Sequence, residues 1–264
     1  ARAELGAAAV FSGITTRTWP SKRGQLRAAD PLAIAHPNAG PYLVSTTAIA
    51  IENTHNFGGG TVQSIEEIKK LRTTSQAMGI SLHLDGARIW NAHIASGIGL
   101  KDFGAHVDTL SVCLSKGLGA PVGSLMISTK ERIARARVWR KRYGGGMRQI
   151  GILAAAGHYA LDNNITRLTD DHFRAKKLAE ACHKTVSSTI DPTTVETNIV
   201  ALDITGATIN AAEFAAQAKQ KGLLLSALGP NFVRLVTHLD IDDESTEKAG
   251  KILVDLLKSA FVAK

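Results

Sequence analysis

Short apolar runs alternate with amphipathic helical segments in the first half of this chain, and that alternation constrains the fold more than any other feature. Strands are predicted at 47–53, 80–86 and 108–117, with helical patterns between them at 65–79 and 87–97. Strand, helix and strand in this order are typical of a mostly parallel sheet covered by helices on both faces. We therefore expect an α/β fold.

Side chains that cap backbone amides mark several helix boundaries. Ser64 with Glu67, and Ser128 with Glu131, have the spacing of a capping box, in which a hydroxyl and a carboxylate accept hydrogen bonds from amides at a helix start. At the front of the chain, Gly6 is predicted to end a helix, and a strand is predicted to follow it.

The last third of the chain changes character. Two strands alternate with two helices between about residues 197 and 262, which is the pattern of a small α+β unit. We expect a large domain over residues 1–185 and a small C-terminal domain over residues 186–264.

Composition limits the class of protein. With 264 residues, 44% of them hydrophobic, the chain can bury the cores of two domains. No apolar run approaches the roughly 20 residues of a membrane-spanning helix, so we expect no membrane partner. Two cysteines, Cys113 and Cys182, are too few for a disulfide framework and favour a cytoplasmic protein. A targeting segment upstream of Ala1 stays open.

The formal net charge of +8 is concentrated in one stretch of the chain. Eight lysines and arginines lie between Lys130 and Arg148, with Glu131 as the single acidic residue. Three interpretations are open: a solvated helix face with a subunit contact, a site for phosphate or carboxylate, and a nucleic-acid surface. No aromatic stacking pattern accompanies the charge, so we expect no nucleic-acid partner.

Three polar residues, His55, Asp85 and Lys116, each follow a predicted strand. Ligands of an open α/β sheet bind beyond the carboxyl ends of its strands, so these side chains can share one crevice. An Asp and a Lys together suit pyridoxal phosphate (PLP). The lysine amine forms an imine with the cofactor aldehyde, and the carboxylate keeps the ring nitrogen protonated. The simpler interpretations are a solvated lysine and an aspartate that caps the next helix.

Five segments of the sequence together resemble the low-specificity L-threonine aldolase family, whose members have the fold of type I PLP enzymes. The resemblance runs from about Glu4 to the C-terminus. The segments are ENTHN (52–56), HLDGARIWNA (83–92), SVCLSKGLGAPVGSLM (111–126), RYGGGMRQIGILAAAG (142–157) and VRLVTHLD (233–240).

The resemblance implies a function and a set of roles. The expected reaction is the retro-aldol cleavage of L-threonine or L-allo-threonine, and of other β-hydroxy-α-amino acids, to glycine and an aldehyde. The implied roles are Lys116 as the covalent PLP anchor, Asp85 on the ring nitrogen, Arg88 on the ring-hydroxyl side, His55 near the substrate β-hydroxyl, Arg234 on the α-carboxylate and Arg148 on phosphate or carboxylate, across a subunit interface.

The same resemblance implies a homo-oligomer that is a dimer of dimers, and the absence of the family's N-terminal part from this chain. The family's N-terminal part supplies a phosphate-binding turn and a histidine that stacks on the cofactor, and we expect this chain to lack both.

His83 and His93 have no metal-ligand spacing, so no metal is expected. Two alternatives stay open: a β-eliminating PLP lyase of the same fold, which would yield pyruvate and ammonia, and a non-catalytic relative that binds a polyanion.

Overall fold

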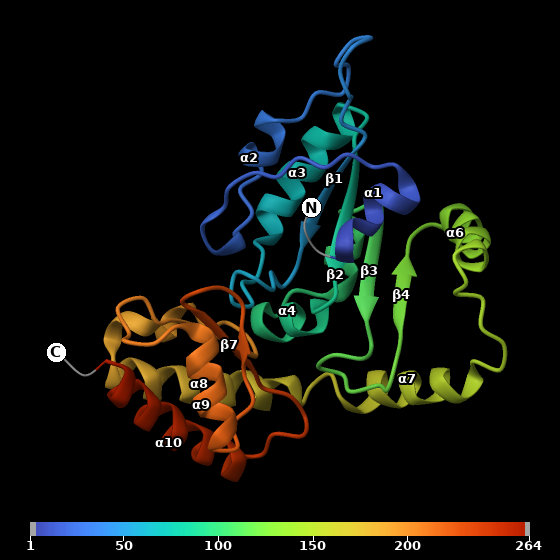
Figure 1. The fold of residues 1–264 in the computed structure, drawn as a ribbon. Helices are drawn as coiled ribbons and strands as arrows, with labels where there is room; N and C mark the ends of the chain where they lie inside the picture. Colours follow the sequence, from blue (N-terminus) through green and yellow to red (C-terminus); the bar gives the residue numbers. More distant parts are fainter. Residues whose placement is uncertain (1–3, 262–264) are drawn as a thin grey trace.

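Two separate sheets organise the protein, of which the computed structural model describes residues 4–261 (Figure 1). The first sheet has the strand order β1-β2-β3-β4, in which β1, β2 and β3 are parallel and β4 is antiparallel to β3. The predicted α/β class with a mostly parallel sheet is confirmed. The strands are β1 (Ala48–Glu52), β2 (Ser81–Gly86), β3 (Thr109–Cys113) and β4 (Ser124–Ile127).

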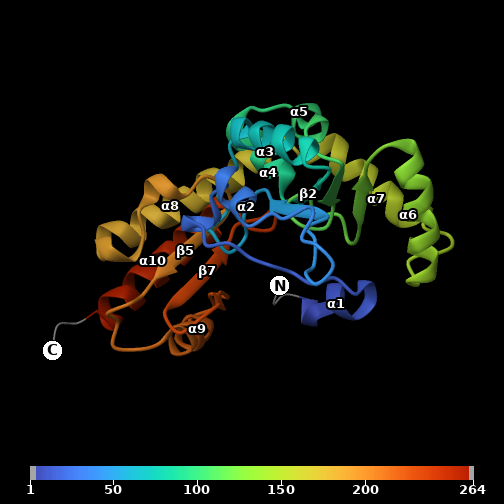
Figure 2. The same ribbon diagram turned by 90° about the horizontal axis from the view of Figure 1, so that it is seen from above.

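The two faces of this sheet differ. Helices α3 (Ile65–Ala77), α4 (Ile89–Ser96) and α5 (Leu100–Ala105) gather on one face, whereas α1 (Ala7–Ser12) lies on the other side (Figure 2). The side chains of β1, β2 and β3 alternate accordingly. Those toward α3, α4 and α5 are buried and apolar, and those on the opposite face are small or polar and partly exposed.

The front of the chain departs from the prediction made for it. A strand was expected after Gly6, but residues Ala7–Ser12 form α1. The segment begins with three alanines, which have the highest helix propensity, and none of its side chains is buried. A short apolar run therefore did not distinguish strand from helix here. Another short helix, α2 (Ala29–Ala33), follows before β1.

The two predicted capping boxes are each only partly formed. The Ser64 hydroxyl accepts from the Glu67 amide at 3.4 Å, but the Glu67 carboxylate accepts from the Ala28 amide at 2.7 Å. Helix α6 (Lys130–Arg142) is capped one residue later than predicted, because Thr129 accepts from the Arg132 amide. The Ser128 hydroxyl instead donates to the Asp108 carbonyl at 2.6 Å.

The second sheet is antiparallel, with the order β5-β7-β6. Its residues Val200, Leu202 and Val233 belong to a second core, with helices packed against it. The remaining elements of residues 4–261 are α7 (Gly151–Asn163), α8 (Leu168–Thr185), β5 (Ile199–Asp203), α9 (Ala211–Gln220), β6 (Ser226–Ala227), β7 (Phe232–Val236), α10 (Asp243–Ala260) and short 3-10 helices at Glu4–Gly6, Lys22–Gly24, Ser187–Thr189 and Pro192–Thr194.

Helix α8 connects the two cores. Leu168 at its start packs into the core of the first sheet, while Ala175, Leu178 and Cys182 pack into the second core. The division into residues 1–185 and 186–264 stays a prediction, and most of α8 packs with the C-terminal side of it. None of the helices between residues 4 and 261 is both long and apolar enough to cross a lipid bilayer.

Candidate active site

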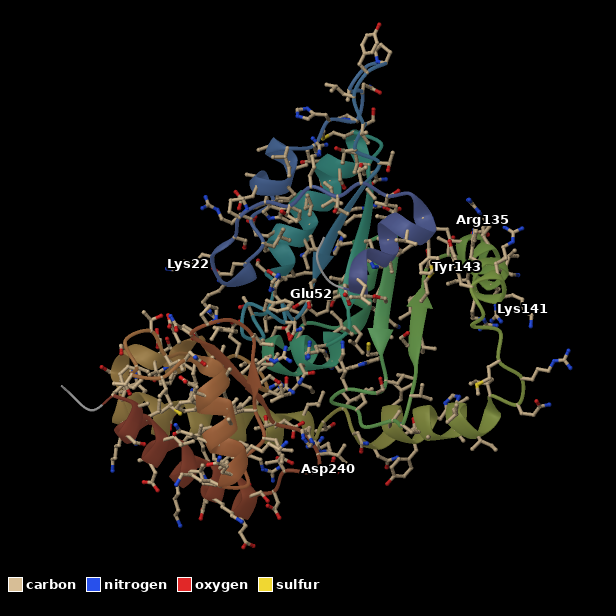
Figure 3. The ribbon with its side chains drawn as sticks, viewed as in Figure 1. Lys22, Glu52, Arg135, Lys141, Tyr143 and Asp240 are labelled. Atoms are coloured by element: carbon tan, nitrogen blue, oxygen red, sulfur yellow. The ribbon has the colours of Figure 1, made fainter. Side chains whose placement is uncertain are left out.

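A row of polar side chains crosses the carboxyl end of the first sheet. Glu52 of β1 is in register with Asp85 of β2, and Asp85 is in register with Ser111 of β3. Residues in register on neighbouring strands point to the same face, which here is the face opposite α3, α4 and α5. Glu52 lies where the first sheet approaches the second one (Figure 3). This edge is where the predicted site residues were expected to meet.

Asp85 offers one carboxylate oxygen to a ligand. Its Oδ1 accepts from the Ala87 amide at 3.0 Å and from the Ser111 hydroxyl at 3.5 Å. Between residues 4 and 261 no group donates to Oδ2, and the side chain is exposed. Gly86, the next residue, is required by packing, since a Cβ there would lie 2.9 Å from the Ser111 carbonyl oxygen. The bonds to Oδ1 fix the carboxylate and leave Oδ2 free to accept.

Lys116 lies on the connection between β3 and β4, with its side chain exposed. Its carbonyl accepts from the Gly119 amide at 2.9 Å, and Gly119 has a φ of +73° that favours glycine. Residues at the end of α7 and the start of α8 donate hydrogen bonds to the carbonyls of the loop that follows Lys116. Asn164 donates to the Leu118 carbonyl at 2.7 Å, and Arg167 donates to the Gly117 carbonyl at 3.4 Å. The loop is therefore anchored while the lysine amine stays accessible.

His55 follows β1 in a tight loop that fixes the direction of its ring. Its Nδ1 accepts a hydrogen bond from the Gly58 amide at 3.0 Å, and its Nε2 lies 3.8 Å from a Glu52 carboxylate oxygen. The ring packs against Gly24, where a Cβ would lie 2.2 Å from the His55 Cγ. A backbone N–H can only donate, so Nδ1 carries no proton in this arrangement. The neutral ring then carries its proton on Nε2.

The charges of Arg234, Glu52 and Asp85 all act on the guanidinium of Arg88. Burial lowers the pKa of Arg88, and the positive charge of Arg234 lowers it further, while Glu52 and Asp85 act in the opposite direction. Arg234 lies on β7, and its Nη1 donates to Asn56 Oδ1 at 2.6 Å. Its Nε is buried and has no hydrogen-bond partner within residues 4–261. A buried cationic donor without a partner suits an anionic ligand.

Arg148 is not brought to these residues within one chain. It is an exposed residue of the connection between α6 and α7. That connection lies beyond β4, away from the second sheet (Figure 1). Arg135, Lys141 and Tyr143 are on or next to α6 in the same region, far from Glu52 (Figure 3). A hollow of about 700 Å³ between β4 and α6 is lined in part by arginines and is likewise separate from the acidic row.

The histidines that could suggest a metal have structural partners. His83 Nδ1 lies 2.7 Å from the Thr109 hydroxyl, and burial lowers the pKa of His83. His93 Nδ1 lies 2.6 Å from the Ile98 carbonyl. Within the described part of the chain, no cluster of three His, Cys, Asp or Glu side chains is arranged to hold a metal ion.

Sequence reasoning missed Glu52, Asn56 and Ser111 as members of this site. Glu52 and Asn56 are the two ends of the ENTHN motif, so the motif carried a signal for them. Ser111 needed the strand register, because only the pairing of β2 with β3 places its hydroxyl beside Asp85.

Comparisons with known proteins show the family to which the chain belongs. Residues 1–205 match the β-eliminating lyase family. Low-specificity L-threonine aldolase 1 of Arabidopsis thaliana is 39% identical over 210 residues, which cover 79% of this chain and 59% of that protein. The low specificity L-threonine aldolase of Escherichia coli K12 is 39% identical over 241 residues, 91% of this chain and 69% of that protein. This chain thus spans about three fifths to two thirds of these relatives.

Solved structures show the same fold. The threonine aldolase of Leishmania major superposes with a TM-score of 0.74 and 20% identity, over 96% of this chain and 75% of that one. A candidate L-allo-threonine aldolase from Listeria monocytogenes superposes with a TM-score of 0.78 and 21% identity, over 97% of this chain and 72% of that one. At these identities the likeness concerns the fold alone.

Proposed function

Because this chain belongs to the β-eliminating lyase family and, within it, to the low-specificity L-threonine aldolases, we propose that it cleaves L-threonine and L-allo-threonine to glycine and acetaldehyde. Other β-hydroxy-α-amino acids are included in the proposal. The fold is that of type I PLP enzymes, and such lyases depend on PLP. The observation that carries the proposal is Asp85, held through Oδ1 with Oδ2 left to accept, beside the Lys116 loop.

The side chains at the sheet edge fit PLP. Lys116 offers an accessible amine for the covalent link, and Asp85 Oδ2 offers an acceptor for the ring N–H. Arg88 would face the hydroxyl side of the ring. When bound, the cofactor supplies an electron-poor ring that accepts the electrons of the breaking Cα–Cβ bond. This chain's residues bind and orient the reactants around it.

Arg234 is proposed to bind the substrate carboxylate. A planar guanidinium can hold a carboxylate through two parallel hydrogen bonds, which fixes the substrate's torsion about Cα. The buried Nε supports this role, since a carboxylate would give it the acceptor that it otherwise lacks. Arg148 is proposed to contribute to a phosphate or carboxylate site of a neighbouring subunit, because the connection between α6 and α7 that carries it lies beyond β4, away from the second sheet (Figure 1).

His55 is proposed to act as a hydrogen-bond donor and not as the base. The Gly58 amide occupies Nδ1, and the remaining nitrogen, Nε2, carries the proton of the neutral ring. A ring in this state has no lone pair for the β-hydroxyl proton. A water beside Nε2 can instead accept that proton and pass it to solvent as the aldehyde leaves.

Product analysis tests the proposal directly. The purified protein, saturated with PLP, is incubated with L-threonine, L-allo-threonine and L-serine. We expect glycine and acetaldehyde from both threonines, with Lys116→Ala as the inactive control. Ammonia with 2-oxobutanoate from the threonines, or with pyruvate from L-serine, in place of glycine would support the β-elimination that the family description also allows.

Assembly, location and the rival binding role are further proposals. We propose a homo-oligomer built of dimers. We also propose a reducing compartment such as the cytoplasm, a location that the free Cys113 and Cys182 support.

A polyanion-binding role without catalysis would rest on the basic helix α6. A steep loss of nucleic-acid affinity with rising salt, together with no turnover, would favour that role over the aldolase.

A further inference from the structure

We propose that Asn56 is a positioning residue that fixes the guanidinium of Arg234 for the substrate carboxylate; the inference rests on the proposed aldolase function. The Asn56 Oδ1 accepts from Arg234 Nη1 at 2.6 Å, across 178 positions of sequence. It is a hydrogen bond between the loop after β1 and the second sheet. Asn56 is thereby a link between the two halves of the site.

The backbone of Arg234 is already fixed by its sheet. It lies in the middle of β7, in register with Ala201 of β5 on one side and Ser226 of β6 on the other. Only the rotation of the long side chain remains to be set. An arginine side chain loses considerable rotamer freedom when it is ordered, so a partner that orders it in advance lowers the entropy cost of binding.

Asn56 is itself held in place by the loop. Its backbone N–H donates to a Glu52 carboxylate oxygen at 3.1 Å, and its backbone carbonyl accepts from the Gly59 N–H at 3.2 Å. Glu52 ends β1, so the sheet edge fixes Asn56, and Asn56 in turn fixes Arg234. Glu52 thus positions Asn56 through one of its oxygens, while the other lies 3.8 Å from His55 Nε2.

The bond to Nη1 decides which edge of the guanidinium is offered to substrate. The Nε and Nη2 N–H groups form the other edge, and Nε has no partner in the described part of the chain. A neutral amide oxygen leaves the positive charge of Arg234 for the substrate. A carboxylate at position 56 would keep the hydrogen bond but neutralise that charge.

Two variants of the holoenzyme separate these effects. Asn56→Ala removes the acceptor, and Asn56→Asp keeps an acceptor of the same size but adds a negative charge. Binding of glycine, which has the carboxylate, is compared with binding of 2-aminoethanol, which lacks it, through the change in visible absorbance. Asn163→Ala is the matched control, because Asn163 lies exposed on α7 and its side-chain amide donates to the Tyr159 carbonyl within the same helix.

We expect both Asn56 variants to weaken glycine binding by about tenfold, the size of one charge-assisted hydrogen bond. Binding of 2-aminoethanol should change less than about twofold, within the scatter of one lost surface contact. The control should bind both compounds as the parent does. An equal loss for both compounds would mean that Asn56 does not act through the carboxylate, and the proposal would be wrong.

A second measurement needs no substrate. Nuclear magnetic resonance reports rotation of the Arg234 guanidinium about its Nε–Cζ bond, with Arg234→Lys used to assign the signal. Rotation should be slow in the parent and in Asn56→Asp and fast in Asn56→Ala. Fast rotation in the parent, or no difference between the parent and Asn56→Ala, would overturn the positioning role. Should the parent fail to bind glycine while rotation behaves as expected, the aldolase function fails and the positioning of Arg234 stands.

Discussion

Lys116 is one of several exposed lysines, and its chemistry depends on where its loop is held. The loop leaves β3 next to the strand that carries Asp85 and is anchored from behind by Asn164 and Arg167. We expect borohydride reduction of the PLP-loaded protein, followed by peptide mass mapping, to find the pyridoxyl group on Lys116. Lys116→Ala should abolish turnover, whereas Lys101→Ala, on the exposed face of α5, should not change it. A label on another lysine would contradict the assignment.

His55 allows a second prediction, because its tautomer follows from one backbone amide. The side-chain amide of His55→Gln retains a donor near the Nε2 position but cannot act as a base. We expect His55→Gln to stay within about tenfold of the parent in kcat, and His55→Phe to lose about a hundredfold or more. Equal and large losses in both variants would show that His55 takes the proton. The long-range nitrogen–proton correlations of the ring report the tautomer directly.

At the scale of elements, Asp108 holds three of them together. It precedes β3, accepts from the Leu82 amide of β2 at 2.9 Å, and pairs with Arg72 of α3 and with Arg132 of α6 at 3.0 Å. Burial alone would raise the pKa of Asp108, but the hydrogen bonds from Leu82 and Arg72 and the two arginine charges outweigh it and lower the pKa. The ionised form is therefore favoured in the folded state.

Asp108→Asn should lower the free energy of unfolding by ~1 kcal/mol at neutral pH, because it leaves the partly buried donors of Leu82 and Arg72 poorly matched. A group whose pKa is lowered by folding stabilises the protein above its unfolded pKa of about 4. That contribution disappears as the pH falls through the lower, folded pKa. The difference between variant and parent in urea unfolding should accordingly shrink below pH 4. Asp255→Asn, on the exposed face of α10, is the control, and a constant difference across pH would contradict the argument.

At the scale of the whole molecule, the segment before β5 joins the two sheets. Glu196 accepts from the Val62 amide at 3.2 Å and pairs with Arg23 at 3.3 Å, and the Thr197 hydroxyl donates to the Gly60 carbonyl at 2.9 Å. The loop that carries His55 and Asn56 is therefore held at its C-terminal end by the segment before β5, in addition to the bond between Asn56 and Arg234 of the second sheet.

Glu196→Ala should loosen this join and cost ~1 kcal/mol of stability, the size of a typical hydrogen bond. Hydrogen exchange of the Val62 amide should become faster, and exchange should also rise in the neighbouring loop residues. Amides in the centre of β2 should exchange as in the parent. Glu180→Ala, exposed on α8, is the matched control. Unchanged exchange at Val62 would mean that Glu196 does not hold the join.

The sequence by itself determined the parts of this protein that depend on local periodicity. Alternating apolar residues set β1, β2 and β3, and the 3.6-residue period set α3, α4, α9 and α10. The ends of the predicted strands brought His55, Asp85 and Lys116 to one crevice, because ligands of an open α/β sheet bind beyond the carboxyl ends of its strands, but they did not include Glu52 or Ser111. The short Ala7–Ser12 segment was mispredicted because its few residues fit either period.

Only the tertiary structure decided which distant residues meet. The register that places Glu52 and Ser111 beside Asp85, the bond between Asn56 and Arg234, and the distance of Arg148 from all of them are set by packing between elements. A sequence pattern repeats over two to four residues, whereas these contacts join segments 26 to 178 positions apart. Their geometry follows from how two hydrophobic cores fill space, and no local pattern encodes that.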